Sequence, residues 1–136
     1  MSSSLTALTG FLVFLAVTLA LLGVVVVTGF QAKRRLHLPA VALAVASLGV
    51  TIYYAEQLGR SYDLEAAGAI YPIHLTIAKI ATVSYLLPII TGIRTLKNPS
   101  RKRTHRMVAF LVLGLTVLTA CTGTAMVLMA EPLPTP

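Results

Sequence analysis

Four long apolar stretches, separated by short polar loops, most constrain what this chain can fold into. They cover about residues 5–30, 39–59, 70–93 and 107–130. Each is long enough for the hydrocarbon core of a bilayer, which needs about 20 mostly apolar residues in a helix. The loops between them are too short to bury a core of their own. The sequence therefore predicts an all-α fold, an integral membrane four-helix bundle in which residues 1–136 form a single membrane domain.

The charged residues are segregated between the two ends of these stretches. Nine of the 11 Lys and Arg residues lie in two loops, after the first and third stretches: Lys33, Arg34, Arg35, Arg94, Lys97, Arg101, Lys102, Arg103 and Arg106. The four acids, Glu56, Asp63, Glu65 and Glu131, fall toward the other end. Because Lys and Arg in short loops stay on the cytoplasmic side, we predict that the basic loops are inside and both termini outside. The net charge of +7 is then a topology signal, and it favours anionic lipid headgroups over nucleic acid as neighbours.

The first stretch and the single cysteine carry two smaller expectations. No positive charge precedes the first apolar run, which is longer than that of a signal peptide and lacks an Ala-x-Ala site, so we expect a retained helix. Cys121 is the only cysteine, which excludes an internal disulfide and two-cysteine metal motifs. We expect it to be a buried structural thiol.

Sequence motifs that are typical of enzymes are missing from the chain. The sequence contains no phosphate-binding loop, nucleophile elbow, HExxH motif or dinucleotide fingerprint. It also lacks a convincing set of acid, base and nucleophile. We therefore expect no enzyme activity from this chain alone.

Three histidines are the first candidates for a cofactor site. His37 and His105 each follow a basic loop, so the predicted topology places both at the inner membrane face, whereas His74 opens the third helix from the outer side. A bis-histidine haem needs two imidazoles at similar depth, a condition that only His37 and His105 meet. The neighbouring cations suit haem propionates. The sequence leaves two interpretations open: ligands of haem b or a metal, or interfacial groups that are solvated or touch headgroups.

A second polar group is expected in the outer half of the membrane, formed by Tyr53, Glu56, His74 and Lys79. Lys79 lies roughly 13 Å into the third helix at 1.5 Å per residue. A lysine at that depth costs about 2.5–3.5 kcal/mol on insertion scales. We therefore expect Lys79 to point into the bundle, neutralised by Glu56 or by a tyrosine of the second helix. This group is either a structural ion pair between the second and third helices or a functional pocket for a proton, a metal or a headgroup.

Small residues and prolines indicate how the helices pack. The pairs Ala40/Ala44 and Ala42/Ala46 have the four-residue spacing that lets two membrane helices approach closely. Pro88 is expected to kink the inner half of the third helix.

Several short stretches resemble a family of small four-helix bacterial membrane proteins that includes the CtaM-type (YozB-like) assembly factors of haem–copper oxidases. The stretches are the run from Lys33 to Leu38, Ile70-Tyr71, His105-Arg106 and Thr122-Gly123. That family usually has further histidines at places that correspond here to positions near Glu56 and Ala78. The chain departs from the family there.

The resemblance implies an accessory protein of the bacterial cytoplasmic membrane that helps a haem–copper respiratory complex to mature, with that larger complex as its partner. Two other classes stay open. One is a b-type cytochrome that carries electrons through a haem held by His37 and His105, and the other is a purely structural subunit of a larger membrane complex.

Overall fold

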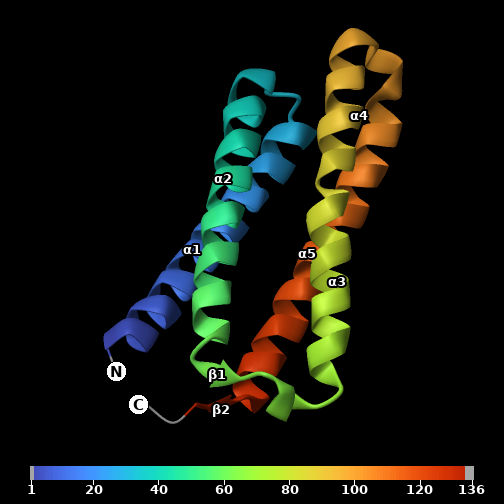
Figure 1. Cartoon of the computed structure of the whole chain (residues 1–136). Helices are drawn as coiled ribbons and strands as arrows, with labels where there is room; N and C mark the ends of the chain where they lie inside the picture. The colour runs from blue at the N-terminus through green and yellow to red at the C-terminus, as the bar shows by residue number, and fades with distance from the viewer. Residues whose placement is uncertain (1, 134–136) are drawn as a thin grey trace. The chain divides into compact units, whose positions relative to one another are not determined.

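Long helices make up most of the chain in the computed structural model, which describes residues 2–133 and the side chains of residues 5–133. Figure 1 shows the helices α1 (Ser2–Phe30), α2 (Arg34–Gly59), α3 (Ile70–Ser84), α4 (Leu86–Lys97) and α5 (Lys102–Met129). The short elements are β1 (Tyr62–Asp63), β2 (Glu131–Pro132) and the 3-10 turns η1 (Glu65–Ala67) and η2 (Pro99–Arg101). β1 and β2 pair, and the Leu133 N–H donates to the Ser61 carbonyl over 3.1 Å. The all-α prediction is confirmed.

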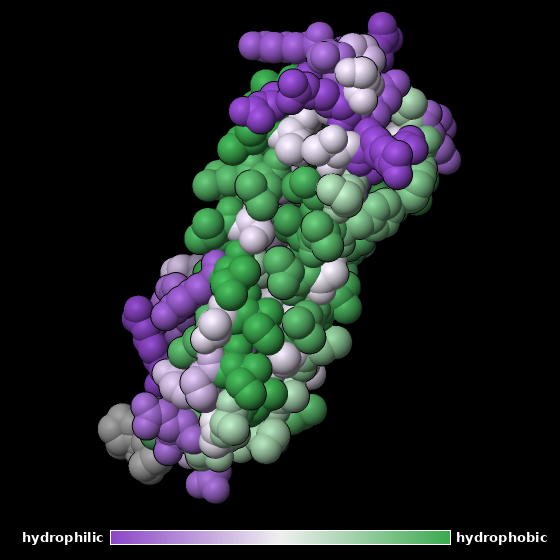
Figure 2. Space-filling view, turned by 90° about the vertical axis from the view of Figure 1, so that its right-hand side faces the viewer, coloured by the Kyte–Doolittle hydropathy of each residue, from purple (hydrophilic) through white to green (hydrophobic). Residues whose placement is uncertain are grey.

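Four helical segments are long and apolar enough to cross a membrane: Leu5–Phe30, Arg34–Gly59, Ile70–Lys97 and Pro99–Met129. They contain the predicted stretches and extend past them mainly at the basic ends, because apolar sequence marks the lipid-embedded part of a helix rather than its hydrogen-bonded ends. Figure 2 shows a band of hydrophobic side chains between hydrophilic ends on the face turned to the viewer. Large apolar side chains such as Leu128 (80% exposed) point outward. Such a surface suits lipid contact, so the chain is an integral membrane protein.

The structure divides into two compact units. The first consists of residues 2–62 with 132–133 and is built from α1 and α2; the second consists of residues 63–131 and is built from α3, α4 and α5. Each unit is described by itself below.

In the first unit, α2 turns a stripe of small residues toward α1. Ala40, Ala44, Ser47 and Thr51 are buried at alternating steps of four and three, the spacing of one helix face. Thr18 of α1 meets this stripe, with its Oγ1 2.8 Å from Ser47 Oγ and 3.1 Å from Thr51 Oγ1. The prediction for Ala40/Ala44 is confirmed, and that for Ala42/Ala46 is wrong because both lie on the exposed face of α2.

The turn between α1 and α2 is a Schellman motif. The Lys33 N–H donates to the Thr28 carbonyl over 3.0 Å, and the Ala32 N–H donates to the Gly29 carbonyl over 3.3 Å. Ala32 occupies the left-handed position at φ 54°, where glycine is usual. The turn reverses the chain in three residues and brings the start of α2 back against the end of α1.

In the second unit, the third membrane segment is interrupted between α3 and α4. The interruption falls at Tyr85, three residues before Pro88. Proline has no N–H to donate to the carbonyl four residues earlier, here Ser84, and its ring crowds that carbonyl. The predicted disturbance at Pro88 is confirmed. The Tyr85 hydroxyl lies 2.6 Å from Thr116 Oγ1, which joins the interruption to α5.

Candidate functional site

His37 packs against the end of α1 within the first unit. Its Nδ1 lies 3.0 Å from the Val25 carbonyl oxygen and 3.3 Å from Thr28 Oγ1. Its Cε1 faces Gly29, where an added Cβ would lie 3.2 Å from that carbon. The ring is thus half-buried against a Thr-Gly pair on the neighbouring helix.

His105 has the same surroundings within the second unit. Its Nδ1 lies 3.1 Å from Thr91 Oγ1 of α4. A Cβ added to Gly92 would lie 3.3 Å from its Cε1. Another Thr-Gly pair therefore holds a half-buried imidazole at the basic end of the helices.

His74 repeats the arrangement at the opposite end of the second unit. Its Nδ1 lies 3.0 Å from Thr122 Oγ1 of α5, and the ring also bonds the backbone of Thr119. A Cβ added to Gly123 would lie 2.8 Å from its Cε1. Thr119 precedes Thr122 by three residues, as Val25 precedes Thr28. We call such a Thr-Gly pair, with the ring packed on it, a Thr–Gly seat.

The hydroxyls of the three seats favour one tautomer of each imidazole. Thr28, Thr91 and Thr122 each donate their hydroxyl proton to the carbonyl four residues earlier, over 2.7, 2.8 and 2.9 Å. A hydroxyl has one proton, so when a carbonyl accepts it, the oxygen is left to accept from Nδ1. For His37 the Val25 carbonyl, which only accepts, requires the same. In the neutral ring the proton is then on Nδ1 and the lone pair on Nε2, the nitrogen that commonly ligates haem iron or metals.

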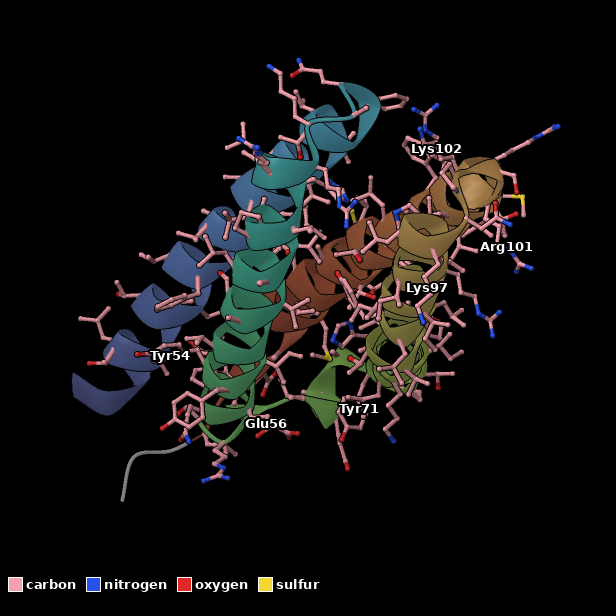
Figure 3. All side chains as sticks on the ribbon, turned by 90° about the horizontal axis from the view of Figure 1, so that it is seen from above. Tyr54, Glu56, Tyr71, Lys97, Arg101 and Lys102 are labelled. Atoms are coloured by element: carbon pink, nitrogen blue, oxygen red, sulfur yellow. The ribbon has the colours of Figure 1, made fainter. Side chains whose placement is uncertain are left out.

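A fourth Thr-Gly pair, Thr9-Gly10, carries a tyrosine in place of a histidine. The Tyr54 ring lies so close to α1 that a Cβ on Gly10 would stand 2.5 Å from its Cε1 (Figure 3). Tyr54 also stacks on Phe14, with ring centroids 5.8 Å apart. The close approach of this ring to α1 requires glycine at position 10.

The seated rings mark both ends of the membrane segments. Each unit has one seat at its basic end, with His37 or His105, and one at the other end, with Tyr54 or His74. Along α2 the two rings are separated by roughly 25 Å at 1.5 Å rise per residue. This is close to the roughly 30 Å thickness of a hydrocarbon core.

The members of the predicted outer polar group lie in different units. Tyr53 and Glu56 belong to the first unit and are exposed, and Tyr53 touches Tyr54 edge-on at 5.4 Å between ring centroids. His74 and Lys79 belong to the second, where His74 is seated on α5 and Lys79 is exposed on α3. The ion pair between Lys79 and Glu56 stays a prediction.

Two further observations concern metal chemistry. Cys121 of α5 is exposed, so the prediction of a buried thiol is wrong. Within residues 2–133, no three His, Cys, Asp or Glu side chains gather as a metal-ion site.

The sequence indicated the histidines but not the threonine and glycine residues that their rings pack against. The missed residues are Thr28, Gly29, Thr91, Gly92 and, as partners of a ring, Thr122 and Gly123. The available signal was the dipeptide Thr-Gly, which occurs four times, at residues 9, 28, 91 and 122. Its meaning depends on which helix packs beside it, which the dipeptide itself does not state.

Comparisons with known proteins identify no relative of this chain. No family model matches the chain, and neither a curated protein nor a solved structure matches it.

Proposed function

We propose that this chain is a histidine-ligated haem protein of a bacterial cytoplasmic membrane, accessory to a larger respiratory complex. The observation that supports haem ligation is the threefold repetition of one imidazole setting. In every case Nδ1 lies 3.0–3.3 Å from a threonine hydroxyl, and an Nδ1 that donates leaves the lone pair on Nε2. Ligand histidines are commonly held by such a hydrogen bond from the second nitrogen, which fixes the ring and strengthens the ligand.

The inner histidines are the proposed ligands through Nε2, His37 in the first unit and His105 in the second. Their pairing on one haem follows only from the sequence prediction that both lie at the same membrane face. The positive-inside topology, which orients the four spans, puts both at the cytoplasmic end of their helices. Haem requires two protein ligands at most, since the porphyrin supplies the other four. When bound, haem b supplies a one-electron redox centre. The protein's part is to hold the two rings and to keep Nε2 unprotonated.

The basic residues beside these histidines support the same ligand. Arg34 and Arg35 lie within one turn of His37, and Arg101, Lys102 and Arg106 lie close to His105 in the sequence. Arginine and lysine are the usual partners of carboxylates at a membrane surface. The two propionates of a haem at this depth have cations within reach.

The accessory role rests on size and on the resemblance to oxidase assembly factors. A chain of 136 residues with its loops too short for a soluble domain has little surface besides that of its helices. We propose that its partner is a haem–copper complex, which such a protein assists by holding haem during maturation. A structural subunit without haem is the alternative.

The decisive experiment is the visible spectrum of the detergent-purified protein after addition of haem b. We expect sharp reduced bands from a bis-imidazole haem in the wild type, their loss in His37→Ala and in His105→Ala, and their retention in His74→Ala. His74→Ala is the matched control because it empties a seat of the same construction. Circular dichroism of each variant confirms that the helices are intact.

Two results would contradict the proposal. A wild-type protein without haem bands would leave the structural subunit as the better account. Loss of the bands in His74→Ala alone would move the site to the other membrane face. Co-purification of the tagged chain with an oxidase, and lower oxidase haem content in cells that lack the chain, test the accessory role separately.

A further inference from the structure

A basic hollow lies at the turn between α4 and α5, within the second unit. Its lining residues are Arg94, Lys97, Asn98 and Arg101, around a volume of about 470 Å³. Arg94 and Lys97 stand three residues apart in the last turn of α4, so they share one helix face. Figure 3 shows Lys97 and Arg101 on one side of this turn and Lys102 on the other.

Asn98 builds the turn and adds a neutral donor. It leaves helical geometry at φ −137° and ψ 101°, and its Oδ1 accepts from the Ser100 N–H over 3.1 Å and the Ser100 hydroxyl over 2.7 Å. Because Oδ1 is occupied by donors, the remaining polar atom of the amide is Nδ2, which only donates. All four lining side chains therefore offer hydrogen-bond donors, and three carry a positive charge.

The acids of the second unit are too far away to neutralise these cations. Asp63 and Glu65 precede α3 and Glu131 follows α5, at the opposite end of the helices. The residues from Ile70 to Lys97 span roughly 40 Å at 1.5 Å each. That exceeds the screening length of about 8 Å at physiological ionic strength several times. An anion from outside the chain is the natural counter-charge.

We propose that this hollow binds the phosphate of an anionic phospholipid. Two guanidinium groups match phosphate oxygens in paired hydrogen bonds, and the lysine adds a point charge. The position favours a lipid over free phosphate, because exposed apolar side chains immediately precede the lining residues Arg94 and Lys97 along α4. Ile93 and Leu96 of α4 are 52% and 40% exposed. They form a surface for the acyl chain that continues from the bound headgroup.

A simpler account is that these cations only set topology and complement the negative end of the α4 dipole. That account predicts that every cation at the inner face contributes equally to lipid binding. The proposed site predicts that the lining cations differ from their neighbours. Arg101 is also among the cations proposed for the haem propionates, so the test uses haem-free protein. Arg101 and Lys102 provide the matched pair: they are adjacent, carry the same charge, and only Arg101 lines the hollow.

The experiment is native mass spectrometry of haem-free protein extracted from vesicles of phosphatidylglycerol and phosphatidylcholine mixed in equal amounts. We expect the wild type to retain phosphatidylglycerol preferentially. Arg101→Gln should lower its occupancy at least about 3-fold, and Lys102→Gln should leave it unchanged. The triple variant Arg94→Gln/Lys97→Gln/Arg101→Gln should remove the preference, whereas Lys33→Gln/Arg34→Gln/Arg35→Gln should keep it.

A charge-preserving variant protects the test against loss of insertion. Arg94→Lys/Arg101→Lys keeps every inner charge but lacks the guanidinium fork, and we expect it to lower occupancy as well. Equal effects of Arg101→Gln and Lys102→Gln, or of the two triple variants, would overturn the proposal. Retention that inorganic phosphate at millimolar concentration abolishes would show a phosphate site without lipid selectivity, which also overturns it.

Discussion

In the first unit the hydroxyls of Thr18, Ser47 and Thr51 meet at the centre of the α1–α2 interface. At the middle of the second unit, by contrast, the Tyr85 hydroxyl bonds Thr116 of α5 from the junction where the third membrane segment is interrupted. The continuous α2 uses small residues to approach α1. The second unit instead uses a tyrosine at the junction of α3 and α4, where the helix is interrupted before Pro88, to reach α5. Both solutions bond a hydroxyl between helices, where lipid offers no hydrogen bonds to unpaired polar groups.

The ends of the two units differ in a more informative way. The second unit seats a histidine at each end, and the first seats His37 at one end and Tyr54 at the other. The same Thr-Gly dipeptide thus supports either ring. The glycine therefore serves to let the ring pack closely against the neighbouring helix. The chemistry at each end of a unit depends on whether a histidine or a tyrosine packs there.

The largest expected effect on stability comes from the tightest seat. Gly10→Ala places a Cβ 2.5 Å from Tyr54 Cε1, and we expect a loss of about 1–3 kcal/mol in unfolding free energy, as for other overpacked cores. Gly23→Ala in the same helix meets no atom within 4 Å and should be neutral or gain up to about 1 kcal/mol. Denaturant titration in micelles, followed by circular dichroism, measures both. Equal changes would show that the close approach is unimportant.

The threonine hydroxyls of the histidine seats allow the inner and outer ends to be compared by their effect on haem affinity. If His37 and His105 hold haem, Thr91→Val should weaken haem affinity by about 10–100-fold, because His105 loses its orienting acceptor. Thr28→Val should weaken it less, because the Val25 carbonyl still accepts from His37 Nδ1. Thr28→Ser and Thr91→Ser keep the hydroxyl and should retain most of the affinity. Thr122→Val, at the His74 seat, should leave it unchanged. Haem titration monitored by absorbance gives these affinities, and a valine variant as good as its serine counterpart would exclude a positioning role.

The two central hydroxyl contacts allow a direct contrast between units. Thr18→Val removes the oxygen shared by Ser47 and Thr51, and we expect a loss of about 1–2 kcal/mol because each of these two buried hydroxyls loses one of its partners. Tyr85→Phe removes a single bond to Thr116, for which we expect about 0.6 kcal/mol, the average for such bonds in membranes. The same micelle titration separates the two. A larger loss for Tyr85→Phe would mean that the broken helix, rather than the hydroxyl cluster, carries the stability.

The smallest expected effect lies in the turns. Ala32 of the first unit has φ 54° and Gly68 of the second has φ 62°. Gly68 combines its positive φ with a ψ of −134°, a region essentially restricted to glycine. An L side chain is strained in the left-handed helical region by roughly 1–2 kcal/mol. Part of this is offset by the greater freedom of glycine when unfolded, so Ala32→Gly should gain about 0.5 kcal/mol. Gly68→Ala should lose about 1 kcal/mol. Opposite signs in thermal unfolding would bear out the contrast, and a loss in both would contradict it.

Much of the fold followed from local sequence. The apolar stretches predicted four spans, and Pro88 predicted the disturbed third segment, because both depend on properties of consecutive residues. Of the proposed site, the sequence singled out His37 and His105 because each follows a basic loop. Their partners were not, because Thr28 and Thr91 look like ordinary polar residues inside apolar helices, where threonine commonly bonds its own backbone.

The sequence by itself determined where each helix crosses lipid and which loops are basic, since hydropathy and charge are read along the chain. The packing of the helices decided that Ala44 faces α1 while Ala42 does not, that Cys121 is exposed, and that Nδ1 of each histidine lies beside a threonine hydroxyl. These depend on the rotation of one helix against another. In a membrane segment apolar on nearly every side, no amphipathic face indicates that rotation, and close packing of small residues and hydroxyls sets it instead.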